Sequence, residues 1–101
     1  MKRREYRISP IFVNKVWINR VLIDPHFESK HGEQISDHLI IELVKGLNWR
    51  LELAEARDKK GYSYFVTLLK LNERQYRLIW LMEADLDYLG VINAYRDDRK
   101  R

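Results

Sequence analysis

Lys70, Arg77, Asn93 and Tyr95 have the side-chain types and the spacing to hold a phosphate group. If the strands that carry them pair as antiparallel neighbours, Lys70, Arg77 and Asn93 form one row across three strands. Tyr95 lies two residues beyond Asn93 and therefore points to the same side. Two cations that face each other repel unless an anion lies near them. This row is the strongest candidate site in the sequence, and a phosphate is the ligand that it predicts.

Three apolar runs must position these side chains. The runs 64–71, 76–82 and 88–96 are rich in β-branched, aromatic and aliphatic residues. Polar clusters at 72–75 and 83–87 separate them, as turns separate strands. The pattern predicts an antiparallel β-meander.

Two assumed pairings set the register of this meander: Leu71 faces Tyr76, and Met82 faces Tyr88. They predict a mostly apolar face that packs against a helix, made of the rows Leu69/Leu78/Ile92, Thr67/Trp80/Gly90 and Phe65/Met82/Tyr88. The other face carries the candidate row and the rows Val66/Leu81/Leu89 and Leu68/Ile79/Val91. A slip of one residue in either turn would move the affected side chains to the opposite face.

The N-terminal part of the chain predicts further strands. Residues 11–13 and 16–23 form one hairpin or two short strands around the dipeptide 14–15. The side chains expected to share a face at period two are Val16, Ile18 and Leu22. Asp24-Pro25 ends this region, because the residue before proline is pushed out of the helical basin.

A helix is expected after a polar connector. Ser36 is a good N-cap, and Ile35 and Ile40 stand at the positions of a hydrophobic staple. An apolar stripe at helical spacing follows, made of Leu39, Ile40, Leu43, Val44 and Leu47, with Gly46 or Asn48 as the stop. Residues 49–53 alternate apolar with charged and predict an edge strand or an extended link, and 57–61 predict an exposed loop.

Length and composition favour one α+β domain over residues 1–101, an antiparallel meander packed against one or two helices. The 101 residues suffice for a single core, and 46% hydrophobic residues exclude a disordered chain. There is no cysteine, and no apolar run approaches the roughly 20 residues that a membrane span needs. We therefore expect a cytoplasmic protein without a membrane partner.

The net charge of +4 lies at the two ends of the chain. Residues 1–7 carry four Lys or Arg, and residues 96–101 carry four more. If the termini lie close together, they form one basic patch suited to phosphates. Two solvated tails are the alternative.

If the bound phosphate belongs to RNA, the candidate residues offer groups for cleavage by the ribose 2′-hydroxyl. The reaction needs a base, cationic donors for the charge on the phosphate, and an acid for the leaving oxygen. His31 is the best acid or base by its titration range. Arg77 can hold a phosphate through two hydrogen bonds, Lys70 adds charge, and Tyr95 can stack on a base or donate a proton, with Arg96 supporting the phosphate.

The last third of the chain resembles a known family. The run Tyr76-Arg77-Leu78-Ile79-Trp80, an acidic turn, an aliphatic strand at 89–93 and Arg96 with a basic tail are similar to the C-terminal half of RelE-type ribonuclease toxins. The resemblance implies a bacterial type II toxin that cleaves RNA, including messenger RNA on the ribosome, and that is held inactive by a cognate antitoxin. By this resemblance, Arg77 is the strand arginine that contacts the phosphate, and Arg96 is the arginine after the last strand. Tyr95 lies near the family's C-terminal aromatic residue.

The N-terminal half differs from RelE-type chains, which have two consecutive helices before the meander. An N-terminal half made of strands, a connector and one helix is more similar to other barnase-like and RelE-like ribonucleases. Some of these place a histidine at the start of the helix. His31 would fill that position. Further candidates for RNA binding are Lys30, Arg99, Lys100 and Arg101.

Other interpretations stay open. The same basic face could bind RNA or a protein without catalysis, or the domain could dimerise through an exposed sheet edge or Trp49. Arg77 could be a strand residue paired to an acid, Tyr95 a core aromatic and His31 a loop residue. The tryptophans are expected in the core or at an interface.

A metal site is a weaker interpretation of the connector. Its candidate ligands are Asp24, His26, Glu28, His31 and His38. Residues of these types bind zinc or manganese, but the spacing matches no recognised ligand signature. Because the proposed cleavage needs no metal, neither a metal nor another cofactor is expected.

Overall fold

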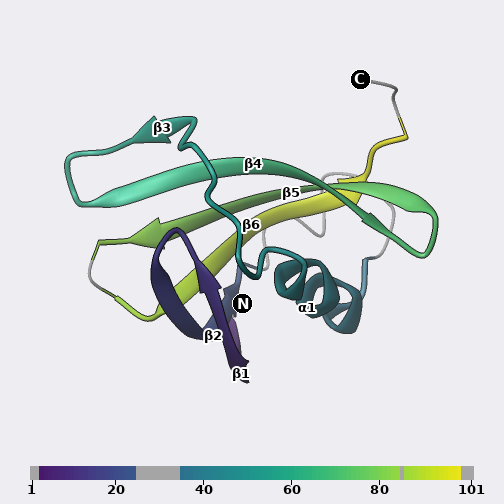
Figure 1. Ribbon diagram of the computed structural model, residues 1–101, viewed down its shortest axis with the longest axis horizontal. Helices are drawn as coiled ribbons and strands as arrows, with labels where there is room; N and C mark the ends of the chain where they lie inside the picture. Colours follow the sequence, from purple (N-terminus) through teal and green to yellow (C-terminus); the bar gives the residue numbers. More distant parts are fainter. Residues whose placement is uncertain (1–2, 25–34, 85, 99–101) are drawn as a thin grey trace.

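The described residues fold into a six-stranded mixed sheet with one helix against it, and the class is α+β (Figure 1). The computed structural model describes residues 3–24, 35–84 and 86–98. The elements are β1 (Arg4–Val13), β2 (Val16–Ile23), α1 (Asp37–Lys45), β3 (Ala56–Arg57), β4 (Tyr62–Leu71), β5 (Arg74–Glu83) and β6 (Tyr88–Arg96).

The strand order is β1-β2-β6-β5-β4-β3. Strands β4, β5 and β6 form the expected antiparallel meander, and β1 and β2 form the expected hairpin. The hairpin joins the meander through a parallel pairing of β2 with β6, which the sequence pattern does not predict. Residues 50–53 form a link outside the sheet rather than an edge strand, after a turn that ends at Trp49, and the short β3 pairs with β4 instead.

Two tight turns close the β1–β2 hairpin and the β4–β5 hairpin. Asn14 and Lys15 have φ of 51° and 65°, and Asn72 and Glu73 have φ of 53° and 67°. Positive φ at both central residues is the geometry of a two-residue turn whose twist matches that of the strands. Asparagine tolerates this region, whereas lysine and glutamate enter it at a cost.

Helix α1 begins and ends where its capping residues predict. The Leu39 backbone N–H donates to Ser36 Oγ at 3.1 Å, and Gly46 follows the last helical residue. Arg4 Nε donates to Asp37 Oδ2 at 2.7 Å, and the Tyr6 hydroxyl donates to the same carboxylate. Strand β1 therefore holds the first turn of α1.

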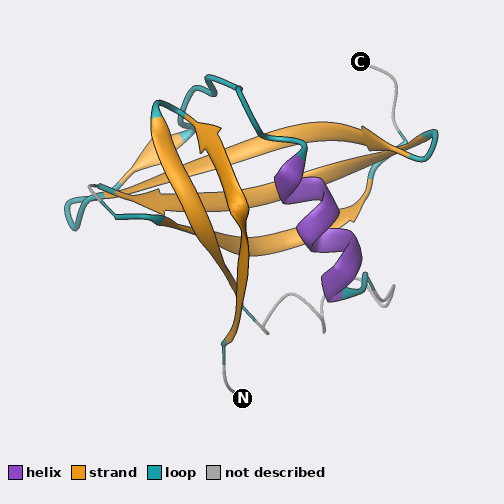
Figure 2. Ribbon diagram, turned by 60° about the horizontal axis from the view of Figure 1, so that its bottom comes forward, coloured by secondary structure: helices purple, strands orange, loops and turns teal. Residues whose placement is uncertain are grey.

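The core lies between the meander on one side and α1 with the β1–β2 hairpin on the other (Figure 2). Trp80 is fully buried, stacks on Phe65 at 4.1 Å between ring centroids, and donates from Nε1 to Thr67 Oγ at 3.0 Å. The hairpin contributes Ile18, Val21 and Ile23 to this core.

Leu22 does not share a face with Ile18, contrary to the period-two prediction. The β1–β2 register shifts between Arg7 and Ile11, where the sum of paired residue numbers changes. This irregularity inverts the alternation beyond Ile18, so Val21 and Ile23 enter the core while Leu22 turns to the other side.

We call the face of the meander turned away from α1 the outer face.

Candidate functional site

The turn between β4 and β5 is shorter than predicted. Asn72 and Glu73 alone form it, so Leu71 faces Arg74 rather than Tyr76. The pairing is shifted by two residues from the expected register. Because an even shift keeps every side chain on its face, the predicted division of β4 and β5 into two faces holds.

Arg77 and Lys70 share the outer face but do not face each other. Arg77 pairs with Leu68, and Lys70 pairs with Gln75. The prediction of two cations directly opposite is therefore wrong. Lys70 is exposed and lies on the diagonal from Arg77, at a distance that long side chains can span.

The side chains in the first half of β6 point to the opposite face of the sheet from the one predicted. Met82 faces Leu89 rather than Tyr88, which is a slip of one residue. Leu89 and Val91 consequently enter the core, whereas Tyr88 and Gly90 belong to the outer face.

A bulge at Ile92 restores the predicted faces for the second half of β6. Trp80 pairs with Val91 and Ile79 pairs with Asn93, so Ile92 has no partner on β5. Beyond this residue the pairing of β5 with β6 differs from the predicted register by two residues. Tyr95 therefore lies directly opposite Arg77. Arg77, Asn93 and Tyr95 therefore share the outer face, although in a different row from the one predicted.

Arg77 forms an ion pair with an acid that the sequence interpretation did not single out. Its Nε donates to Asp97 Oδ2 at 2.8 Å, and Asp97 is only 5% exposed. Asp97 is held further by its backbone N–H, which donates to the Gln75 carbonyl at 2.9 Å, and by Gln75 Nε2, which donates to the Asp97 carbonyl at 2.8 Å. This partner follows Tyr95 by two residues, so the period-two spacing was the signal that could have identified it.

The guanidinium of Arg77 is not fully satisfied by this pair. Its Nη2 atom is buried and has no hydrogen-bond partner among the described residues, while 16% of the side chain stays exposed. A buried donor without an acceptor costs free energy, and such groups often mark the place of a water, an ion or a ligand oxygen.

Arg96 does not join this group. It pairs with Tyr76, whose side chain is buried in the core, so Arg96 points to the face opposite Arg77. Its Nη2 lies 2.9 Å from Asp98 Oδ2 in an exposed ion pair.

Seven candidate residues lie outside the described part of the chain: His26, Glu28, Lys30, His31, Arg99, Lys100 and Arg101. Their roles stay predictions. His38 is described, and it is exposed on α1 rather than on the outer face. Within residues 3–24, 35–84 and 86–98, no group of three or more His, Asp or Glu is arranged to hold a metal.

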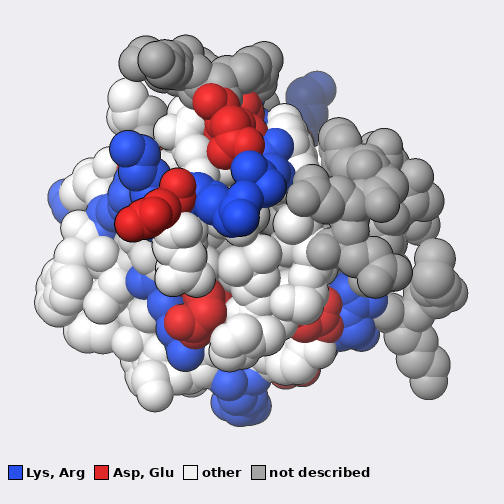
Figure 3. Space-filling view, turned by 90° about the vertical axis from the view of Figure 1, so that its right-hand side faces the viewer, with Lys and Arg blue, Asp and Glu red and all other residues white. Residues whose placement is uncertain are grey.

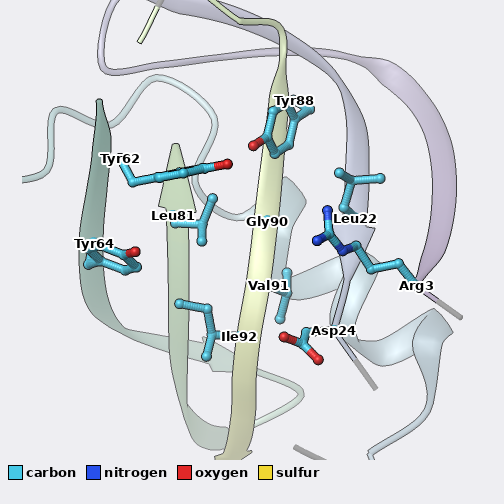
Figure 4. A pocket seen from close by; sticks show the side chains of 10 residues that line it. All are labelled: Arg3, Leu22, Asp24, Tyr62, Tyr64, Leu81, Tyr88, Gly90, Val91 and Ile92. Atoms are coloured by element: carbon cyan, nitrogen blue, oxygen red, sulfur yellow. The ribbon is translucent and has the colours of Figure 1, made fainter. Parts of the chain in front are cut away.

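A second feature of the outer face, which the sequence interpretation missed, is a pocket of about 170 Å³ (Figure 4). We call it the tyrosine pocket. Its lining residues are Arg3, Leu22, Asp24, Tyr62, Tyr64, Leu81, Tyr88, Gly90, Val91 and Ile92. They come from β2, β4, β5 and β6 and from the residues just before β1 and just after β2, so no local motif marks the pocket.

Carboxylates hold two of its tyrosines by their hydroxyl groups. Tyr88 donates to Glu83 Oε1 at 2.8 Å, and Tyr64 donates to Asp58 Oδ2 at 3.0 Å. Burial, followed by the hydrogen bond to Glu83, raises the pKa of Tyr88 well above its usual range. The hydrogen bond to Asp58 raises the pKa of Tyr64. Both hydroxyls therefore stay protonated at neutral pH.

Trp17 and Trp49 form an exposed aromatic cluster with Phe12 at the tip of the β1–β2 hairpin. Trp17 is 56% exposed and Trp49 is 71% exposed, and the ring centroids of the three residues lie 5.0 to 6.0 Å apart. Of the three tryptophans expected in the core or at an interface, Trp80 alone lies in the core.

Basic charge is not gathered into one patch on the described surface. Arg4 at the start of β1 pairs with Ile23, which pairs with Val91, roughly 16 Å along β6 from Arg96. The start of β1 and the end of β6 accordingly lie apart in both ribbon views. In Figure 3, Asp and Glu side chains lie against Lys and Arg side chains.

Comparison of the chain with protein-family models, with curated proteins and with solved structures finds no match in any of the three. Among the described residues, no helix has the length and apolar character needed to cross a membrane.

Proposed function

We propose that this protein is a metal-independent endoribonuclease, similar to RelE-type toxins, that uses the outer face of its sheet to hold RNA and is inhibited by an antitoxin. The observation that carries the proposal is the set of contacts around the Arg77 guanidinium. Its Nε is fixed by Asp97, its Nη2 has no hydrogen-bond partner within residues 3–24, 35–84 and 86–98, and Tyr95 lies directly opposite it. The resemblance of residues 76–96 to RelE-type toxins supports the same function.

The chemistry follows from these positions. The ribose 2′-oxygen attacks the adjacent phosphorus and the bond to the 5′-oxygen breaks, which leaves a 2′,3′-cyclic phosphate and a free 5′-hydroxyl. A base takes the proton of the 2′-hydroxyl, and an acid gives a proton to the leaving oxygen. Arg77 and Lys70 stabilise the negative charge that grows on the phosphate oxygens. His31 and Tyr95 are the residues we assign to the two proton transfers.

A non-catalytic binding module is the second candidate, and one observation favours it. Asp97 already neutralises Arg77, and no histidine of the described residues lies on the outer face. Such a module would bind RNA in a salt-sensitive manner without cutting it. It would use the same face, so the two candidates differ in strand scission and not in location.

Inducible expression in a bacterial host tests the proposal. The wild type should arrest growth and produce new RNA ends that carry a 5′-hydroxyl, and Arg77→Ala and His31→Ala should each relieve the arrest. Lys45→Ala removes one positive charge from α1, on the other side of the sheet, and should arrest growth like the wild type. Circular dichroism of each purified variant shows whether it is folded.

Purified protein then separates the two candidates. Cleavage should continue in excess EDTA, because no step uses a metal. If the wild type arrests nothing and leaves RNA intact both with and without ribosomes, the toxin proposal fails. Salt-sensitive RNA binding without new ends would support the binding module.

A further inference from the structure

The tyrosine pocket takes no part in the proposed cleavage, yet its walls are suited to a flat ring. Tyr62 and Tyr64 lie on β4 with their ring centroids 6.4 Å apart, and Tyr88 closes the other side from β6 (Figure 4). The hydroxyl groups of Tyr62 and Tyr88 point toward one another across the pocket. Three aromatic walls around one hollow offer stacking surfaces to a planar ligand.

These walls are fixed in place before any ligand binds. The carboxylates of Glu83 and Asp58 hold the hydroxyls of Tyr88 and Tyr64 at 2.8 and 3.0 Å. The Arg20 guanidinium lies 5.8 Å from the centre of the Tyr88 ring. A ligand therefore spends little free energy on ordering the rings, which favours binding.

Gly90 keeps the floor of the pocket open. A Cβ at this position would lie 2.9 Å from Leu81 Cδ1, closer than real Cβ atoms approach a neighbour. Any larger residue would press the end of the Leu81 side chain, which also lines the pocket, out of its place. A side chain at position 90 would therefore change the shape of the pocket where Leu81 lines it.

One end of the pocket is polar. The Arg3 guanidinium enters it beside Leu22, and the Asp24 carboxylate lies below, next to Val91. Arginine offers only donors and a carboxylate offers only acceptors, so this end matches a ring whose edge carries both kinds of group. Nucleobases are rings of this kind, with stacking faces and donor and acceptor groups on their edges.

We propose that the tyrosine pocket takes one unpaired base of a single-stranded RNA. The choice of RNA rests on the proposed function. The floor at Gly90 lies roughly 16 Å along β6 from Tyr95, so a short extended RNA strand can reach from the pocket to Arg77. The pocket would then hold the strand at a fixed distance from the phosphate to be cut.

Photocrosslinking tests this inference on the full chain. A short single-stranded RNA that carries 5-iodouridine is irradiated with the protein, and the crosslinked peptide is identified by mass spectrometry. The expected products join the RNA to Tyr62, Tyr64 or Tyr88. Crosslinks confined to the exposed Trp17 and Trp49 would overturn the inference, because they would place the bases on the hairpin tip instead.

Binding measurements give the second readout. Gly90→Ala should weaken RNA binding roughly 10-fold by pushing Leu81 into the pocket, and Tyr64→Leu should weaken it by a similar factor. An RNA with an abasic nucleotide at the crosslinking position should bind the wild type with the same roughly 10-fold loss, and Gly90→Ala should add little to that loss. Trp49→Leu, at the hairpin tip, serves as the matched aromatic control and should bind like the wild type.

The outcomes separate this inference from the proposed function. If the wild type cleaves or binds RNA and the pocket variants and the abasic RNA behave identically to their controls, the pocket inference fails and the proposed function stands. If Gly90→Ala abolishes the crosslink while Arg77→Ala leaves cleavage intact, the pocket holds RNA but the proposed site at Arg77 fails.

Discussion

Arg77 and Asp97 form a nearly buried ion pair in which Nε and Oδ2 are 2.8 Å apart. The pair joins the middle strand of the meander to the residue that follows β6. Asp97→Asn would leave the guanidinium without its counter-charge and should lower the free energy of unfolding by about 3 kcal/mol, measured by urea denaturation. Asp98→Asn is the matched control, because its pair with Arg96 is exposed and its loss should cost no more than about 1 kcal/mol. Equal losses in the two variants would contradict the expectation.

Acid should weaken the contact between β1 and α1. Burial raises the pKa of Asp37, but hydrogen bonds from Arg4 and Tyr6 outweigh it, so the net pKa lies below its usual value. A carboxyl with a lowered folded-state pKa stabilises the protein above its unfolded pKa, near 4, and loses this contribution as the pH falls through the folded-state value. The difference in unfolding free energy between wild type and Asp37→Asn should therefore be largest near neutral pH and shrink below about pH 4. A difference that stays constant from neutral to strongly acidic pH would contradict this assignment.

Relief of backbone strain should stabilise the turn between β4 and β5. Glu73 has a φ of 67°, which glycine adopts without a steric penalty. Glu73→Gly should raise the free energy of unfolding by about 1 kcal/mol. Glu73→Ala removes the same charge but keeps the Cβ atom, so it should give no such gain. Thermal unfolding of the two variants beside the wild type checks both.

The exposed Trp49 should contribute little to stability. Its φ of 69° is strained, and replacement by glycine relieves this while it removes ring contacts to Phe12 and Trp17. The two effects are each of about 1 kcal/mol and oppose each other, so Trp49→Gly should stay within about 1 kcal/mol of the wild type. Trp80→Ala, in the core, should cost about 4 kcal/mol. A large loss for Trp49→Gly in urea denaturation would show that the cluster is a structural element.

Local pattern was enough to predict the three strands of the meander, β2, the end of β1, the helix and its caps, but not the first half of β1 or the short β3. The alternation of apolar and polar residues in β4 and β5 and the capping signals around Ser36 depend on neighbours in sequence. They can therefore be recognised without knowledge of the tertiary structure. The turn at 72–73 was predicted too long because four polar residues in a row do not show which two adopt positive φ. Asn-Glu lacks the glycine that usually marks a two-residue turn.

The pairing of strands that are distant in sequence could not be predicted from the local hydrophobic pattern. Nothing in the sequence of β2 indicates that it lies parallel to β6, because strand partners are chosen by the whole fold. The aliphatic run from Tyr88 to Ile92 likewise contains no proline that would mark a bulge, and Gly90 lies two residues before it. The candidate site was therefore predicted with the right face for Arg77, Asn93 and Tyr95 but with wrong partners across the sheet.

The unpaired residue at Ile92 reverses the alternation of β6 partway along the strand. Leu89, Val91, Asn93 and Tyr95 all have odd numbers, yet the first two lie inside the protein and the last two outside. Removal of Ile92 alone would leave a regular ladder in which Val91 and Asn93 still pair with Trp80 and Ile79, so Tyr95 would stay opposite Arg77. An added residue between Asn93 and Tyr95 would instead carry Tyr95 and Asp97 to the helix side and strip Arg77 of its acid. Across natural variants of this chain, loss of the residue at position 92 should therefore be commoner than an insertion beyond it.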